Sequence, residues 1–121
     1  MSEIRATTIS DAAGTGPVTL TKQSAAKAWV NFNGSGTVAL RDSVNIASVT
    51  DNAVGTYTLN FSNNMANASY STTSASRNRA TGSNNSYTAT SSKRIELWEP
   101  SSSPALSDTD EISAAIHGDL A

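Results

Sequence analysis

The feature that most constrains the fold of this chain is the alternation of apolar and polar residues with a period of two. It is clearest over residues 56–61, where Tyr57, Leu59 and Phe61 alternate with threonine and asparagine. Successive side chains of a β-strand point to opposite faces, so the segment predicts a strand with one apolar face. Residues 28–33 show the same alternation. Because no stretch keeps a helical period, the pattern predicts an all-β protein.

Turn-forming clusters separate several such segments and set the expected architecture. Residues 33–36 read Asn-Gly-Ser-Gly, a sequence that tolerates the positive φ angles of tight hairpin turns. Seven to nine short strands between turns of this kind predict an antiparallel β-sandwich or a jelly-roll-like barrel. A helical turn or a loop is expected over residues 22–27. Strands are expected at residues 18–21, 28–33, 37–41, 45–50, 56–61, around 68–73, 93–98 and 111–117.

The domain organisation follows from where these strand patterns begin. Residues 1–17 are expected to form an extended N-terminal arm, in which Ile4 and Ile9 stand apart on a polar tether and turn-forming residues fill positions 11–17. Two spaced isoleucines suit docking on a neighbouring molecule, although a frayed terminus has the same pattern. Residues 18–121 are expected to form a single β-sandwich domain.

Residues 74–92 contain few apolar side chains and are expected to form an exposed loop with one edge strand near Tyr87.

The chain as a whole has few large apolar side chains with which to form a hydrophobic core. Of the 45 hydrophobic residues in the chain, 18 are alanine, while serine, threonine and asparagine supply 46 of 121 residues. A chain with so few large apolar side chains is often stabilised by burying surface against copies of itself, so self-association is expected.

Composition and charge argue against several classes of function. The net charge of −2 does not favour nucleic-acid binding through phosphate neutralisation, and the chain has no cysteine for disulfides or thiolate metal sites. No stretch is long and apolar enough to suggest a membrane span.

His117 is the only histidine and is expected to be a surface or interface residue, since no nucleophile motif accompanies it. The chain is therefore not expected to be an enzyme or to hold a cofactor.

Three acidic residues near the C-terminal end could attract a cation. Asp108, Asp110 and Glu111 supply oxygen ligands, but their spacing is not that of a calcium-binding loop. A solvated loop, or a salt bridge to an arginine of another subunit, is the preferred interpretation. No metal site is therefore assigned.

Four side chains of the β-domain, together with Ile4 and Ile9 of the arm, are candidates for contact with other molecules. Trp29 and Trp98 lie on the faces of their strands opposite the apolar residues that are expected to form the core. Large aromatic side chains on such outward faces often contribute much of the binding energy of an interface. The competing interpretation is that other parts of the same subunit cover both faces of these strands. Arg77 and Arg79, with Lys93 and Arg94 nearby in sequence, form the only basic concentration. A solvated loop is the preferred interpretation of this concentration, and contact with an acidic capsid surface is the functional alternative.

Residues 24–43, with the later segments 49–52 and 55–61, resemble a module of tailed bacteriophages, notably marine and cyanobacterial ones. In these phages the Lys-Ala-Trp-Val-Asn-Phe run, the glycine turn and the Asp-Asn turn recur in tail-fibre ends and in small virion proteins. The resemblance covers roughly residues 15–73, and residues 116–120 are similar to the C-terminal strand of the module. It implies a β-rich virion component, commonly trimeric, and carries no catalytic residues.

The chain departs from a fibre in having only the module and a short arm, without a shaft. We therefore expect a capsid decoration, or cement, protein that binds the major capsid protein as a homotrimer. It would be made in the host cytoplasm and reside on the virion surface. The alternative is a receptor-binding module of a tail fibre or head fibre, in which residues 74–92 contact a host surface glycan or protein.

Overall fold

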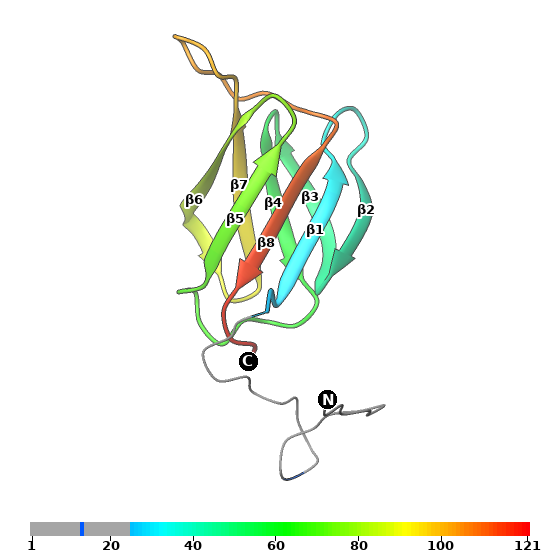
Figure 1. Ribbon diagram of the computed structural model, residues 1–121, viewed down its shortest axis with the longest axis vertical. Coiled ribbons are helices and arrows are strands. Elements are labelled where there is room, and N and C mark those ends of the chain that lie inside the picture. The colour runs from blue at the N-terminus through cyan, green and yellow to red at the C-terminus, as the bar shows by residue number, and fades with distance from the viewer. Residues whose placement is uncertain (1–12, 14–24) are drawn as a thin grey trace, which may run out of the picture.

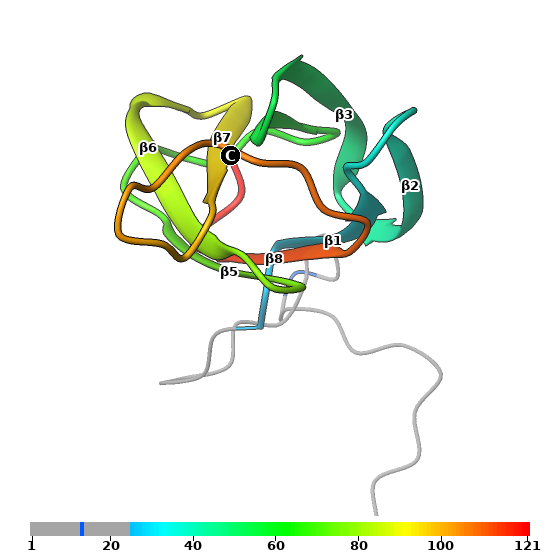
Figure 2. The same ribbon diagram turned by 90° about the horizontal axis from the view of Figure 1, so that it is seen from above.

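The fold is a sandwich of two antiparallel β-sheets (Figure 1). The computed structural model describes residue 13 and residues 25–121, and for residues 83–86 only the backbone. One sheet has the strand order β2-β1-β8-β5 and the other has the order β3-β4-β7-β6, and Figure 2 shows them as two layers. The strands are β1 (Ala28–Asn33), β2 (Ala39–Val44), β3 (Ile46–Ala53), β4 (Thr56–Phe61), β5 (Ser71–Ser76), β6 (Ala80–Ala89), β7 (Ser92–Trp98) and β8 (Ile112–His117).

The all-β sandwich predicted from the alternation is confirmed, and the alternation itself explains the core. In β1 and β8, every second residue is buried between the sheets, and the intervening residues face outward. The Phe32 and Tyr57 rings meet edge to face, with 5.2 Å between their centroids, and join the two layers. The buried apolar residues are Ala28, Val30, Phe32, Ile46, Tyr57, Leu59, Phe61, Met65, Ile95, Leu97, Ile112, Ala114 and Ile116.

Pairing between distant segments closes the sandwich. β1 pairs with β8, joining residues about 80 positions apart, and β4 pairs with β7. Strand β2 lies at a sheet edge, where a bulge between Asn31 and Phe32 shifts its register and where Arg41 and Asp42 are exposed. Bulges and charged side chains discourage an edge strand from pairing with another chain. The strand runs over residues 39–44 and not over the expected 37–41.

The expected exposed loop at residues 74–92 is wrong, although the edge strand at Tyr87 is correct. Strand β5 extends to Ser76, and a turn at residues 77–79 leads into β6, an edge strand of ten residues that contains Tyr87. Hydroxyl groups bridge the two sheet edges here, because the Thr81 hydroxyl donates to the Ser74 carbonyl at 2.9 Å. A hydroxyl group thus links β5 and β6, two strands that supply few apolar side chains.

Two further expectations concern the N-terminal region. The strand expected at residues 18–21 and nearly all of the arm at residues 1–17 lie outside the described residues. Of the expected helical turn or loop at residues 22–27, the described residues 25–27 form no helix. Residue 27 already belongs to the sheet ladder, since the Lys27 amide donates to the Ile116 carbonyl at 2.8 Å.

Tyr70 makes the sandwich sensitive to alkaline pH. Its ring packs edge to face against Phe61, and its hydroxyl lies 2.9 Å from the carbonyl oxygens of Ala89 and Ser92, to which it donates. Burial raises the pKa of Tyr70 from 10.0 to about 12. The folded state therefore resists ionisation of this side chain more than the unfolded state does.

We expect the stability gained from this pKa difference to be complete below pH 10 and to be lost as the pH rises from 10 to about 12. Urea unfolding of the wild-type chain and of Tyr70→Phe across this window tests the effect. The free energy of unfolding should fall more steeply with pH in the wild type than in the variant. Parallel curves would show that Tyr70 contributes nothing to the alkaline transition.

Candidate functional site

The outer face of the β2-β1-β8-β5 sheet carries an apolar strip that crosses all four strands. The register places Trp29 of β1 opposite Val44 of β2 on one side and Ala115 of β8 on the other. Ala115 in turn lies opposite Thr73 of β5. We call these four residues the Trp29 strip. Since the core takes the alternate residues of β1 and β8, the same alternation that builds the core also builds this strip.

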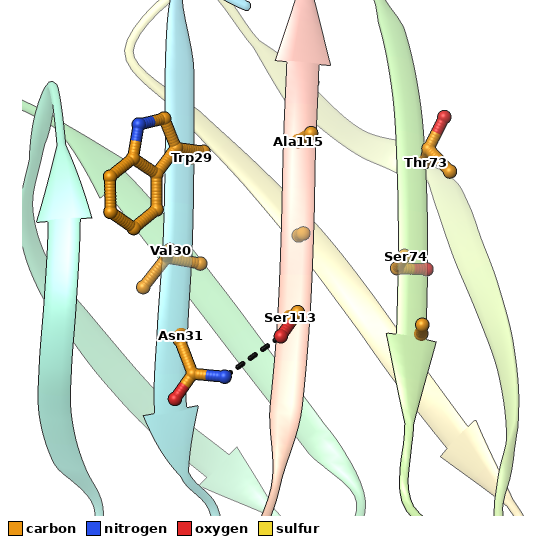
Figure 3. Close-up of a pocket in the computed structure, with 9 residues that line it drawn as sticks. Trp29, Val30, Asn31, Thr73, Ser74, Ser113 and Ala115 are labelled. Atoms are coloured by element: carbon orange, nitrogen blue, oxygen red, sulfur yellow. Dashed lines mark hydrogen bonds between the residues drawn. The ribbon is translucent and has the colours of Figure 1, made fainter.

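A shallow depression of about 390 Å³ lies beside the Trp29 indole (Figure 3). Small side chains form its floor because β8 and β5 present serine, alanine and threonine outward at these positions. Its lining is almost entirely apolar and includes no titratable side chain. The lining residues are Trp29, Val30, Asn31, Thr73, Ser74, Ala75, Ser113, Ala114 and Ala115. Such a surface suits contact with an apolar side chain or segment of another protein.

A polar network borders the strip on the side toward the β1–β2 loop. The Asn31 amide donates to the Ser113 hydroxyl at 2.8 Å, as Figure 3 shows. Arg41 reaches across from β2 and donates to the Asp110 carbonyl oxygen at 2.6 Å. Because these groups are already paired, a partner that covers the strip need not leave them without hydrogen bonds.

The outer face of the other sheet has a different character. Its side chains form a ladder of amides and hydroxyls, in which the Asn60 amide donates to the hydroxyl groups of Ser48 and Thr50 at 3.0 and 2.9 Å. The Arg94 guanidinium stacks over the Tyr87 ring, 3.7 Å from its centroid, and the Tyr87 side chain is 53% exposed. The groups that these contacts join are polar.

The two tryptophans both face away from the core, but they lie on opposite sides of the molecule. Trp29 is on the strip, whereas Trp98 is half-buried on the outward side of β7 in the other sheet. One flat contact surface therefore cannot bury both. Their participation in interfaces stays a prediction, and Trp29 has the more apolar surroundings. Ile4 and Ile9 lie outside the described residues.

The basic concentration expected from the sequence is dispersed in space. Arg77 and Arg79 occupy the β5–β6 turn, and Arg77 forms a salt bridge of 3.1 Å with Asp110. Lys93 faces inward from β7, where it donates to the Thr88 hydroxyl at 2.5 Å, and burial lowers its pKa. Since Arg94 belongs to the outward polar face, the four cations do not form one basic patch.

Two of the acidic residues, Asp108 and Asp110, make side-chain contacts within the chain. One Asp108 oxygen accepts hydrogen bonds from the Gly55 amide and the Tyr57 hydroxyl, both at 2.7 Å. Burial, followed by this contact with Asp108, raises the pKa of Tyr57. Asp110 forms its salt bridge with Arg77 of the same chain, and a salt bridge to an arginine of another subunit stays a prediction. Within the described residues, no three acidic or histidine side chains are placed to hold a metal ion together.

Sequence reasoning missed most of the strip. The outward side chains of β8 could have been read from its alternation, because Ser113 and Ala115 fall between the buried residues. The contribution of Val44 and Thr73 depends on strand neighbours that no local pattern reveals. His117 is half-buried at the end of β8, next to Ser71 in the register.

The chain matches no protein-family model, no curated protein and no solved structure. The part of the chain that the structure describes includes no helix of the length and apolar character needed to cross a membrane. The surface of the sandwich is therefore the basis for a functional proposal.

Proposed function

We propose that this chain is a structural protein of a tailed bacteriophage particle, a capsid decoration protein that binds the major capsid protein on the outer shell and assembles as a homotrimer. The observation that carries the proposal is the Trp29 strip, an apolar surface crossing a whole sheet outside the core. The resemblance of residues 24–61 to a virion module supplies the phage context.

The physical role of the strip is to make contact with protein. Burial of a large aromatic side chain against small neighbours excludes water over a flat area and contributes most of the free energy of many interfaces. A chain of this size gains modestly from each contact, but symmetry and multivalency multiply that gain over a shell. Stabilisation of the capsid would then come from added buried area at subunit junctions.

The alternative is a receptor-binding module of a tail fibre or head fibre. The observation that favours it is the polar face of the β3-β4-β7-β6 sheet, where an exposed Tyr87 ring lies beside Arg94 and rows of hydroxyl and amide groups. Tyrosine with serine and asparagine is a composition that suits adaptable recognition of a host glycan or protein. The recognition surface would then be a strand face and not the loop expected over residues 74–92.

The number of copies in purified virions distinguishes these functions. We expect quantitative mass spectrometry, referenced to the major capsid protein, to find hundreds of copies in each particle, because decoration follows the symmetry of the shell. A few copies to some tens would instead favour the fibre module. Absence of the protein from washed particles would refute both.

A further inference from the structure

We propose that the N-terminal arm of one copy, through the segment that contains Ile4 and Ile9, docks on the Trp29 strip of a neighbouring copy. The inference rests on the proposed function only in treating the strip as a protein-contact surface and the chain as self-associating. It adds the occupant of the strip and the way in which copies are linked.

The first support is the size and chemistry of the strip. Four strands at about 4.8 Å spacing make it about 14 Å wide, which an extended segment of four or five residues spans. The depression beside Trp29 offers room for one branched apolar side chain, with a floor of alanine, serine and threonine. Residues 4–9 carry an isoleucine at each end among small and polar residues. Because residues five positions apart point to opposite faces of an extended segment, one of the two isoleucines at a time meets the strip.

The second support is where the described chain begins. The Lys27 amide donates to the Ile116 carbonyl of β8, and Figure 2 shows residues 25–27, which precede β1, leaving the sheet on its outer side, away from β7. This is the side on which the Trp29 strip lies. The described chain therefore begins on the side of the sheet that carries the strip.

The third support is the length of chain outside the described region. The fifteen residues between Ile9 and Ala25 can extend over as much as about 50 Å, whereas a six-residue strand is about 20 Å long. The isoleucines can thus pass beyond their own sheet and reach a second molecule. Exchange of arms around a closed ring would link three copies and would bury apolar surface that the thin core of each copy leaves exposed.

Disulfide trapping tests the exchange in the full-length chain, because the chain has no native cysteine. One preparation carries Thr8→Cys, beside Ile9, and a second carries Thr73→Cys on the strip. Oxidation of the mixture should form the mixed disulfide-linked dimer at least about tenfold faster than a mixture of Thr8→Cys with Thr50→Cys, because docking raises the local concentration of the two thiols. Thr50 is exposed on β3, in the opposite sheet, and serves as the matched control.

Two outcomes would overturn the exchange. The first is equal rates for the two mixtures. The second is a disulfide that forms only within single molecules of the Thr8→Cys, Thr73→Cys double variant, since the arm would then cover its own strip. As a second measurement, the Ile4→Ser, Ile9→Ser double variant should sediment as a monomer under conditions in which the wild-type chain assembles, and unchanged assembly would also count against the exchange. Neither experiment uses phage particles, so the result is independent of whether the chain is a virion protein.

Discussion

Replacing Gly55 with alanine is expected to lower the free energy of unfolding by roughly 2–5 kcal/mol, from backbone strain together with overpacking. Gly55 has a φ of 63°, in the left-handed region that side chains disfavour. A Cβ atom at this position would lie 2.6 Å from the Ser107 amide nitrogen and 2.7 Å from the Leu97 carbonyl oxygen. Both neighbours are backbone atoms, so the clash cannot be relieved by a side-chain rotation.

The loss should be large because Gly55 joins three segments. Its carbonyl accepts a hydrogen bond from the Leu97 amide at 2.8 Å, and its own amide donates to Asp108. Asp108 also accepts from the buried Tyr57 hydroxyl. Displacement of Gly55 would therefore disturb the β3–β4 turn, the end of β7 and the segment at residues 107–108 together.

Gly36 provides a matched control for this prediction. It has a similar φ of 66°, but a Cβ atom built there meets no other atom within 4 Å. Gly36→Ala should therefore lose only the strain of the left-handed conformation, about 1–2 kcal/mol. Urea denaturation of the two variants measures the difference, and equal losses would mean that the contacts around Gly55 adapt to a methyl group.

Replacing Trp29 with alanine is expected to weaken attachment to phage particles by about 30-fold or more, because loss of the central aromatic residue of the strip would release the arm of the neighbouring copy and with it the multivalent binding of the trimer to the shell. The side chain lies outside the core, so the sandwich itself should remain folded. Its removal deletes the wall of the depression and the largest apolar surface of the strip. Binding of the labelled variant to particles that lack the native protein gives the affinity, and far-UV circular dichroism checks the fold.

Trp98→Ala is the control, because Trp98 also faces outward but lies on the opposite sheet. A decoration protein that assembles through the Trp29 strip should keep its affinity for the particle when Trp98 is replaced. The reverse ranking, in which Trp98→Ala loses attachment and Trp29→Ala does not, would contradict the assignment of the strip. It would direct attention to the polar face that bears Tyr87 and Arg94.

Local sequence patterns predicted the strands with apolar alternation closely. The segment at residues 56–61 is β4, residues 28–33 are β1, and the last strand differs from its expected range by a single residue at the start. Accuracy fell where apolar residues are sparse. Strand β3 continues to Ala53, three residues beyond the expected end at residue 50, and β5 begins at Ser71, three residues later than expected. Such boundaries depend on hydrogen bonds to neighbouring strands, which local composition does not encode.

For the candidate site as well, local patterns predicted the direction of side chains but not their neighbours on other strands. The alternation placed Trp29 and Trp98 on outward faces, which is where the structure has them. It could not reveal that they lie on opposite sheets, or that Arg77 pairs with Asp110 across 33 positions of sequence. These relations follow from the order of strands in each sheet.

By itself, the sequence determined that this chain is an all-β sandwich, because residues two positions apart must share a face of a strand and the apolar faces must be buried together. Only the tertiary structure decided which outward faces join into one surface. Trp29 and Val44 come from consecutive strands, whereas Thr73 and Ala115 come from strands far from them in sequence, and strand pairing brings the four residues into one row. Strand order is a long-range property, set by how the whole interior packs, and the apolar strip exists only through it.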